Sequence, residues 1–538
     1  MKLKFVASLL AASALCSAAP LLAQEAPKPA EQPAPEQPDP SDATADATIA
    51  NAQAVDDAQA KIELLQAQVE ALQSAIDQVK SSMVKATPSW KGAPLFDDKD
   101  AGFSFKPRGA IQWDAGYNGF PRGRELRGTI LGITPTGAQN TNAGLNFQNL
   151  GWNSRARRLL LGADGSLPGG FRYSAELNFA QGAVDFEDVF IAYDFKKAPV
   201  TLQVGHIYPF SSLETMTSSK FTSFMERAGI TDAFNYNRRL GLAFTANDKK
   251  TDSWIVQAGI FNEPVNNGNF THTGWQASLR GVYSPLLGTT RLHLGANFQH
   301  RVNTREAIAQ QYRARPLNQL TDQRFIDTGN IASDGDDVAG LELAAIHKGF
   351  HFAAEAQRVW VRNAYNAFDA ARIASDSGDN DTLPTGAVLL NGDPRFWGGY
   401  AEVGMFLTGE TRGYKGGRFD RTKVLHPFNE GGWGAVQLNG RVDYLNLSDR
   451  VDGSSPSVAA PFFVNGGRQV GYQLSAIWIP TDYVRLMAQY SHIQVTGGPR
   501  ASVSTPTALG LFPVGTTTPP NDRKYGADTW GVRGQVDF

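Results

Sequence analysis

The feature that most constrains the fold of this chain is an alternation of apolar and polar residues, which recurs from Gly102 to the C-terminus. In the segment 171–179, which reads FRYSAELNF, every second residue is apolar and those between are polar or charged. Because successive side chains of a β-strand point to opposite faces, the alternation predicts strands with one apolar and one polar face. Segments of about ten residues with aromatic residues near their ends are typical of strands that cross an outer membrane.

Sixteen segments show this pattern, at 103–117, 154–163, 171–180, 185–195, 199–207, 239–247, 253–262, 273–284, 290–301, 339–347, 350–362, 396–408, 434–447, 467–479, 482–495 and 527–538. Closed bacterial barrels usually have an even number of strands, although the alternation slips in 154–163, 185–195 and 350–362 and leaves fourteen or eighteen strands as alternatives. A soluble two-sheet protein would show the same period, but charged residues in the middle of the polar faces favour a barrel. We therefore predict an all-β fold, a transmembrane antiparallel β-barrel of about 16 strands over residues 102–538.

The connections between the predicted strands alternate between short and long, as in outer-membrane barrels, whose short turns are periplasmic. One connection breaks this rule, because 409–433 is long, lies on the side of the short turns and is rich in Arg and Lys. A barrel of sixteen strands is too wide for its side chains to fill, so we expect a water-filled lumen. Long connections that fold inward would narrow this lumen to a pore.

Four segments precede the barrel. Residues 1–23 begin with two lysines before an apolar stretch and are interpreted as a secretory signal peptide. Residues 24–51 are rich in Pro, Ala and acidic residues, which predicts a disordered spacer. Residues 52–84 predict an α-helical coiled coil, and residues 85–101 a linker.

The coiled coil is predicted from a heptad repeat. One core position holds Val55, Ile62, Val69, Ile76 and Met83, and the other holds Ala58, Leu65, Leu72 and Val79. Spacings of three and four that alternate over about four heptads indicate helices that associate, because a helix of this length is marginally stable alone in water. A lone amphipathic helix packed on a partner is the alternative.

The sequence also argues against several functional classes. After the signal peptide, no apolar run approaches the ~18–20 residues of a membrane helix. The one cysteine, Cys16, lies within the signal peptide, so the exported chain is expected to build no disulfide. No G-x-S-x-G, H-E-x-x-H or Gly-Lys sequence occurs, and the eight histidines are scattered. We therefore expect no enzymatic activity, no cofactor, no metal site and no nucleic-acid partner.

Charged residues on the polar faces are the candidates for a function. By strand parity, the inward-facing cations are Lys106, Arg108, Arg158, Arg172, Arg239, Arg280, Arg291, Arg441 and Arg485. The inward-facing carboxylates are Asp114, Glu176, Asp188, Asp194, Glu342, Glu355, Glu402 and Asp443. Arg is always charged and matches the geometry of oxyanions, and rings of Arg and Lys are the expected filter of anion pores. For each single residue, an ion pair that stiffens the wall is the alternative.

Six stretches carry a more specific signal. They read FSFKPRGAIQWDAG (103–116), SRARRLLLGADGSLPGGFRYSAELNFA (154–180), GHIYPFSSLETMTSSKFTSFMERA (205–228), RRLG (238–241), FLTGETRGYKGG (406–417) and GGWGAVQLNGRVDYLNL (431–447). Together and in this order they resemble the phosphate-selective porin O/P family. The resemblance implies a trimeric sixteen-stranded barrel whose loops fold inward around an arginine-lined path. The third extracellular loop would then be 208–238, which brings Lys220 and Arg227 inward. The chain departs from the family at Leu160, where a second Arg is frequent.

The resemblance implies an outer-membrane porin through which small anions, phosphate or other oxyanions, diffuse passively along an Arg/Lys-lined constriction. The expected partners are outer-membrane lipid, further copies of the chain in a homotrimer, and the permeating anions, with the coiled coil in the periplasm. Two alternatives stay open. One is a general or sugar-permeable porin with weak ion selectivity, and the other is a barrel-anchored tether whose coiled coil contacts a periplasmic partner or the cell wall.

Overall fold

The computed structural model describes residues 55, 58–74, 76, 89–90, 92–98, 100–119, 150–182, 184–262, 264, 274–304, 309–366, 369, 388–449, 464–502 and 517–538. The chain divides into two compact units, Met1–Met83 and Val84–Phe538. In the first unit, residues 58–74 are helical. The predicted signal peptide, 1–23, and the predicted spacer, 24–51, lie outside the described residues.

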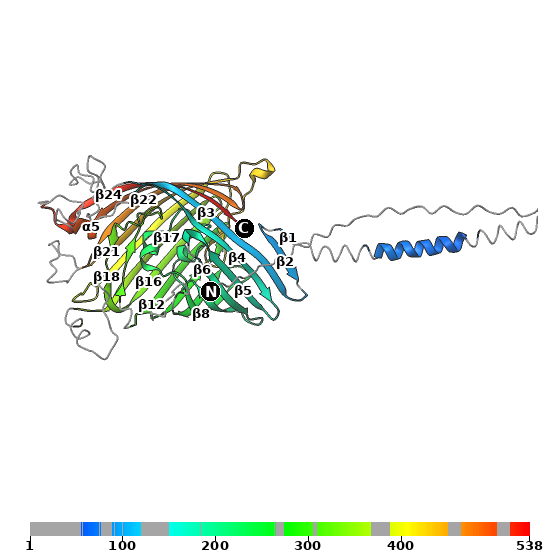
Figure 1. Cartoon of the computed structure of the whole chain (residues 1–538), viewed down its shortest axis with the longest axis horizontal. Coiled ribbons are helices and arrows are strands. Elements are labelled where there is room, and N and C mark those ends of the chain that lie inside the picture. The colour runs from blue at the N-terminus through cyan, green and yellow to red at the C-terminus, as the bar shows by residue number, and fades with distance from the viewer. Residues whose placement is uncertain are drawn as a thin grey trace, which may run out of the picture. The chain divides into compact units, whose positions relative to one another are not determined.

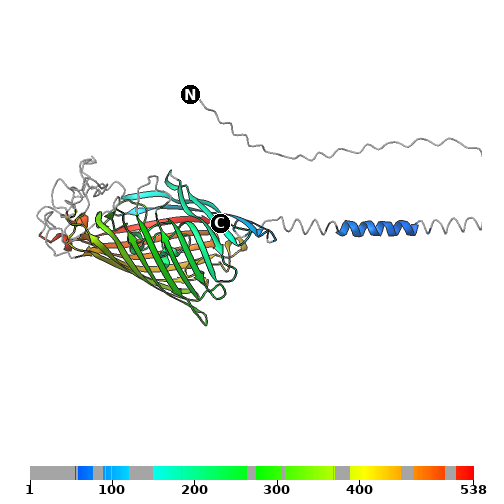
Figure 2. The same cartoon turned by 90° about the horizontal axis from the view of Figure 1, so that it is seen from below.

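Sixteen antiparallel strands of the second unit close into a barrel (Figures 1 and 2). In chain order they are β3 (Phe103–Asn118), β4 (Gly151–Leu167), β5 (Phe171–Asn178), β6 (Asp185–Asp194), β7 (Val200–Ile207), β8 (Arg239–Asn247), β9 (Trp254–Phe261), β10 (Trp275–Tyr283), β12 (Thr290–Val302), β16 (Ile331–His347), β17 (Phe350–Ala364), β18 (Arg395–Phe406), β21 (Ala435–Asp449), β22 (Val464–Thr481), β23 (Val484–Thr496) and β24 (Lys524–Asp537). Strand β24 pairs with β3 and closes the barrel. Each predicted segment holds one strand, so the prediction of sixteen is confirmed and the alternatives of fourteen and eighteen are wrong.

The other elements are short. They are the strands β1 (Ser89–Trp90), β2 (Pro94–Asp98), β11 (Leu286–Leu287), β13 (Ala309–Gln310), β14 (Arg313–Ala314), β15 (Ile326–Asp327), β19 (Gly413–Tyr414) and β20 (Phe419–Asp420), the helices α2 (Leu213–Met216), α3 (Gly229–Phe234) and α5 (Pro499–Ser502), and the 3-10 turns Ala180–Gly182, Phe428–Glu430 and Pro520–Asp522. Within the described residues, no helix combines the length and apolar character needed to cross a membrane.

The two faces of the barrel strands differ as the alternation predicts. Large apolar side chains stand on the outer face, where Ile260, Leu341 and Leu474 are each more than 60% exposed. The residues between them point inward and are buried, and many of them are polar, such as Gln299 and Gln473. An apolar outer band with a polar interior is the arrangement that a lipid bilayer requires of a barrel.

The segment expected to be a linker, 85–101, contains two of the short strands. Strand β2 pairs with the start of β3, where Phe96 is opposite Phe105. The pairing of β24 with β3 reaches only as far as Ala110, and the C-terminal Phe538 then exchanges two backbone hydrogen bonds of 3.1 Å with Gly109. Strand β2 therefore covers the edge of β3 that the end of the chain leaves open, and an open edge is a site for unwanted pairing.

Strand β16 is longer than its predicted segment. The alternation is clear only from 339, whereas the strand begins at Ile331 and pairs with both β12 and β17 from Gly335 onward. The added stretch reads IASDGDDV, in which Asp334, Asp336 and Asp337 break the apolar alternation. These residues lie toward the end of the barrel with the long connections, where no lipid face needs to be apolar.

Candidate functional site

The long connection 208–238, hereafter the lumen loop, folds into the barrel as the resemblance implies. Its helices α2 and α3 place Leu213, Ile230 and Phe234 in one buried apolar cluster with Phe396 and Leu445 of the barrel wall. The Ser212 hydroxyl accepts the Thr215 N–H (3.3 Å) and caps the start of α2. The lumen loop thus fills part of a lumen that we expected to be open and water-filled.

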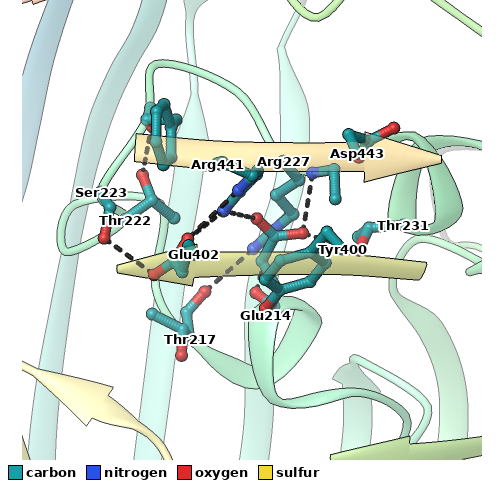
Figure 3. A network of polar contacts seen from close by, with 12 residues as sticks. Glu214, Thr217, Thr222, Ser223, Arg227, Thr231, Tyr400, Glu402, Arg441 and Asp443 are labelled. Carbon is teal, nitrogen blue, oxygen red and sulfur yellow. Dashed lines mark hydrogen bonds and ion pairs between the residues drawn. The ribbon is translucent and has the colours of Figure 1, made fainter. Parts of the chain in front are cut away.

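Ion pairs also hold the lumen loop to the part of the wall formed by β18 and β21, which carries Phe396 and Leu445 (Figure 3). Arg441 on β21 donates to Glu214 of the lumen loop (2.7 Å) and to Glu402 on β18 (2.5 Å). The other Glu214 oxygen accepts the Ala228 N–H and the Thr231 hydroxyl, both at 2.8 Å. Because these charges are buried, loss of one partner would leave another uncompensated, which is strongly destabilising.

The unusual connection between β18 and β21 also reaches inward, as expected for 409–433. The Phe419 N–H donates to the Thr217 hydroxyl of the lumen loop (3.3 Å), and Arg412 donates to the Phe221 carbonyl (3.2 Å). The Arg418 guanidinium lies 3.4 Å from the Met216 carbonyl. The lumen is therefore narrowed from both ends of the barrel.

Between the lumen loop and strands β3 to β9, a cavity of about 1290 Å³ remains. It is lined by eight Arg and three Lys, and by eight Asp and Glu, which gives an excess of three positive charges. The cationic side chains are Arg108, Arg157, Arg158, Arg172, Lys220, Arg227, Arg238, Lys249, Arg315, Lys415 and Arg418. We regard this cavity as the candidate site, because the loops leave this part of the lumen unfilled and its wall is rich in charged side chains.

A bulge in β4 explains how two consecutive arginines face the cavity. Gln112 on β3 is opposite Arg158, whereas the next residue, Trp113, is opposite Ala156, so Arg157 is the extra residue. A β-bulge re-aims side chains locally. Arg157 therefore points inward and pairs with Glu226 of the lumen loop (2.7 Å), although strict parity places it on the lipid face. This bulge is also why the alternation slips in 154–163.

Three of the cavity-lining arginines have no carboxylate within 4 Å among the described residues. Arg158 donates to the Gln112 side chain (2.7 Å), and Arg418 contacts the Met216 carbonyl (3.4 Å). Arg227 donates to the backbone carbonyls of Glu214 (3.1 Å) and Thr217 (3.0 Å). Their positive charges are thus held in place by neutral groups and are not neutralised by an ion pair.

Other predicted residues in or near the cavity are paired. Arg108 donates to Asp164 and Glu176, each at 2.9 Å, and the Lys220 amine lies 3.9 Å from Glu176. Arg172 pairs with Asp194 at the mouth of the cavity. Burial lowers the pKa of Lys220, so this amine loses its charge more easily than an exposed lysine.

The remaining predicted cations do not line the cavity. Arg280 is fully buried in a pair with Glu342 (2.7 Å), and Arg441 holds the lumen loop. Arg239 packs on Tyr236, with its Cζ 4.1 Å from the ring centre, and Arg291 donates to the Ser284 carbonyl (2.8 Å) at the short-turn end. Lys106 is half-buried near that same end. Arg280 and Arg441 therefore form buried ion pairs that stiffen the structure, which was the alternative to a pore-lining role.

Besides Arg157, strand parity missed five cations of the cavity wall, namely Arg238, Lys249, Arg315, Lys415 and Arg418, and two of them illustrate why. Arg238 pairs with Glu187 and Asp188 and lies 4.2 Å from the centre of the Tyr208 ring. Arg418 comes from the inward connection, which has no strand period to interpret. Only the density of Arg and Lys in that connection and the Arg238–Arg239 pair signalled them in the sequence.

Comparison with known proteins is consistent with this architecture. A family model described as phosphate-selective porin O and P matches residues 136–507. An uncharacterized protein of Caulobacter vibrioides is 33% identical over 460 residues, which are 84% of this chain and 77% of that protein. Porin O of Pseudomonas aeruginosa is 25% identical over 307 residues, which are 54% of this chain and 64% of that protein.

Two solved structures match most of the chain at low sequence identity. OmpT of Vibrio cholerae is 8% identical, with a TM-score of 0.43 over 81% of this chain and 98% of that one. OprB of Pseudomonas putida is 12% identical, with a TM-score of 0.43 over 82% of this chain and 95% of that one.

Proposed function

Because the chain belongs to the phosphate-selective porin O and P family, we propose that its barrel lets small anions diffuse passively across the outer membrane, with phosphate and related oxyanions preferred. As a member of that family it is a porin and not an enzyme. The preference for anions, and for oxyanions among them, is the part that we propose.

The observation that carries this proposal is the set of arginines without a carboxylate partner, Arg158, Arg227 and Arg418. A guanidinium is weakly hydrated and offers paired donors that match two oxygens of a phosphate. Since neutral groups position these three, their charge is available to a passing anion. Lys220 adds a fourth cation that shares its carboxylate, Glu176, with Arg108.

The excess of positive charge along the cavity supports the same proposal. Cations outnumber carboxylates by three there, so a cation would meet net repulsion and an anion net attraction. Paired residues such as Arg108 and Arg157 contribute little, because their carboxylates compensate them. Selectivity should therefore depend on a few unpaired residues and not on the total number of arginines.

The test is the zero-current potential of the purified protein in a planar bilayer under a KCl gradient, followed by titration of phosphate. We expect an anion-selective potential and block of the chloride current by low phosphate. The variants Arg158→Gln and Arg418→Gln should each lower the anion preference several-fold. Arg291→Gln, at the short-turn end outside the cavity, is the matched control and should leave it unchanged.

A weakly selective potential without phosphate block would contradict the proposal. The chain would then be a general porin, and permeation of neutral sugars by liposome swelling would be the next measurement. Equal effects of Arg158→Gln and Arg291→Gln would place the selectivity outside the cavity.

We further propose that a signal peptide (1–23), a spacer (24–51), a coiled coil (52–84) and a linker (85–101) precede the barrel. In this proposal the helix at 58–74 self-associates as part of the coiled coil. Ile62, Leu65, Val69 and Leu72 are each more than half exposed in the isolated chain. An exposed apolar seam at heptad spacing is stable only when it is covered by a partner helix. In a homotrimer, the copies of this helix supply the cover.

Mass photometry of the full chain in detergent should give the trimer, and Leu65→Glu with Leu72→Glu should weaken it. If the variant stays trimeric but the cell envelope loses integrity, the helix serves instead as a tether to a periplasmic partner or the cell wall.

A further inference from the structure

A group of arginines lies on the outer face of the barrel, where lipid is expected. Arg358 and Arg362 are on β17, and Arg395 is on the neighbouring strand β18. Arg358 is opposite Ala339 and Trp397, and Arg395 is opposite Trp360. Since residues opposite each other in a sheet share a face, the exposed Trp397 places Arg358 on the outside.

The depth of this group follows from the register. Strand β17 starts at Phe350, after a two-residue turn, and leads toward a long connection. Arg358 is eight residues further on, about 26 Å along the strand at about 3.3 Å per residue. At a tilt of about 40° this is about 20 Å along the barrel axis, near the far edge of an apolar band about 25 Å tall. Arg395 and Arg362 lie still further out.

Aromatic rings mark the same level as a membrane interface. The Arg358 guanidinium lies 5.4 Å from the centre of the Trp360 ring. Trp397 packs against Tyr444 with ring centres 4.8 Å apart. Trp and Tyr gather at the level of lipid headgroups, so the three arginines reach the headgroup layer of the outer leaflet.

The group has more positive than negative charge. Asp337 is shared by His300 (2.7 Å) and Arg362 (3.4 Å). The Asp449 carboxylate accepts the backbone N–H of Arg395 (2.8 Å) and not its guanidinium. Among the described residues, no carboxylate lies within 4 Å of the guanidinium of Arg358 or Arg395. An unpaired arginine beside an apolar band is costly unless an anion meets it there.

We propose that this outer surface, formed by Arg358, Arg362, Arg395 and the flanking Trp360 and Trp397, binds the phosphorylated sugar headgroup of the outer-leaflet glycolipid. Phosphate monoesters on a rigid sugar present several oxygens at the level where the guanidinium groups end. Guanidinium donors bind such oxygens in pairs, and the indole rings pack on the sugar and the first acyl carbons. The site lies on the opposite face of the wall from the cavity and does not depend on which solute passes.

The test uses the full chain in detergent and bis-phosphorylated hexa-acyl lipid A as the probe, with retention measured by native mass spectrometry. We expect Arg358→Gln with Arg395→Gln to weaken binding at least tenfold, and Arg358→Lys with Arg395→Lys to weaken it less. Arg468→Gln is the matched control, because Arg468 is an exposed outward residue at the same end on β22, outside the group. It should change binding less than twofold.

Two readouts confirm that the glutamine variants fold, namely unchanged channel conductance and unchanged resistance of the barrel to unfolding by dodecyl sulfate. Equal retention by the wild type and the double glutamine variant would overturn the proposal. So would equal retention of phosphate-free lipid A, or of phosphatidylglycerol. A change in oligomeric state with unaltered lipid A retention would make the group a contact between copies of the chain, which also overturns it.

Discussion

The Arg533 guanidinium, on the last strand of the barrel, forms a bidentate pair with the Asp114 carboxylate on the first, with N···O distances of 2.6 and 2.7 Å. The two residues are opposite each other where β24 pairs with β3, so the pair crosses the closure of the barrel. Arg533 also donates to the Met225 carbonyl (2.5 Å) and to Glu226 (2.9 Å) of the lumen loop. Closure of the barrel and the position of the lumen loop therefore share one residue.

Removing the charge of Asp114 should destabilise the barrel. Asp114→Asn leaves the fully buried Arg533 guanidinium with Glu226 as its one carboxylate partner. We expect the barrel to lose about 3 kcal/mol of unfolding free energy, at the lower end of what breaking a buried ion pair costs. Urea unfolding in lipid vesicles measures it. Asp528→Asn is the matched control, because Asp528 lies on β24, the strand of Arg533, but is 42% exposed, where an ion pair contributes about 1 kcal/mol or less. Equal losses for both variants would contradict a role for burial.

Removing the carboxylate of Glu226 should raise the anion preference of the channel. Burial alone would raise the pKa of Glu226, but the Arg157 guanidinium outweighs it and holds the pKa well below its usual range. The carboxylate is therefore ionised and compensates Arg157. In Glu226→Gln that charge is released to the cavity, so the zero-current potential should shift toward the chloride equilibrium potential. A shift in the opposite direction would mean that Arg157 does not face the permeation path.

The charge of Lys220 should make the selectivity dependent on pH in the alkaline range. Because burial lowers its pKa below the ordinary 10.5, Lys220 loses its proton at a lower pH than a free lysine. The anion preference of the wild type should therefore fall as the pH rises toward 10.5, with the fall complete at a lower pH than for an exposed lysine. Lys220→Arg should remove this fall, since arginine stays protonated over that range. Identical profiles for the two proteins would assign the titration to another group.

Breaking the clamp at Arg441 should release the lumen loop. Arg441→Met leaves Glu214 buried without its guanidinium partner and Glu402 with only the more distant Arg412 (3.4 Å), at a cost of about 3–5 kcal/mol. We expect faster proteolysis within 208–238 and noisier, larger single-channel currents. Arg280→Met is the control, because it breaks an equally buried pair, with Glu342, that has no contact with the lumen loop. It should lower stability without altering proteolysis of the loop.

The strands could be predicted from the sequence because lipid imposes the same alternation on each of them. Even in the weak segment 154–163, enough of the pattern survived to place β4. Parity could not predict the bulge at Arg157, because an extra residue in a strand has no distinctive composition and only shifts the register of the residues around it.

The filling of the lumen could not be predicted in the same way. Leu213, Ile230 and Phe234 occur in a connection without any strand or helix period, and their partner Phe396 lies more than 160 residues away in sequence. The pairing of Arg280 with Glu342 likewise depends on the register of three strands. Strand parity indicates which face a charge is on but not whether its partner is a carboxylate or a carbonyl.

The apolar cluster under the lumen loop also affects the electric field in the remaining cavity. Behind the lumen loop, the barrel is packed with apolar side chains, which cannot reorient to screen a charge, whereas the opposite wall of the cavity carries the arginines of β3 to β5. Field lines from those arginines are therefore confined to the water between the two sides, and each charge acts over a longer distance than in an open tube. A substitution of one arginine in that wall should therefore change the ion current more than expected for one residue among the many that line the cavity.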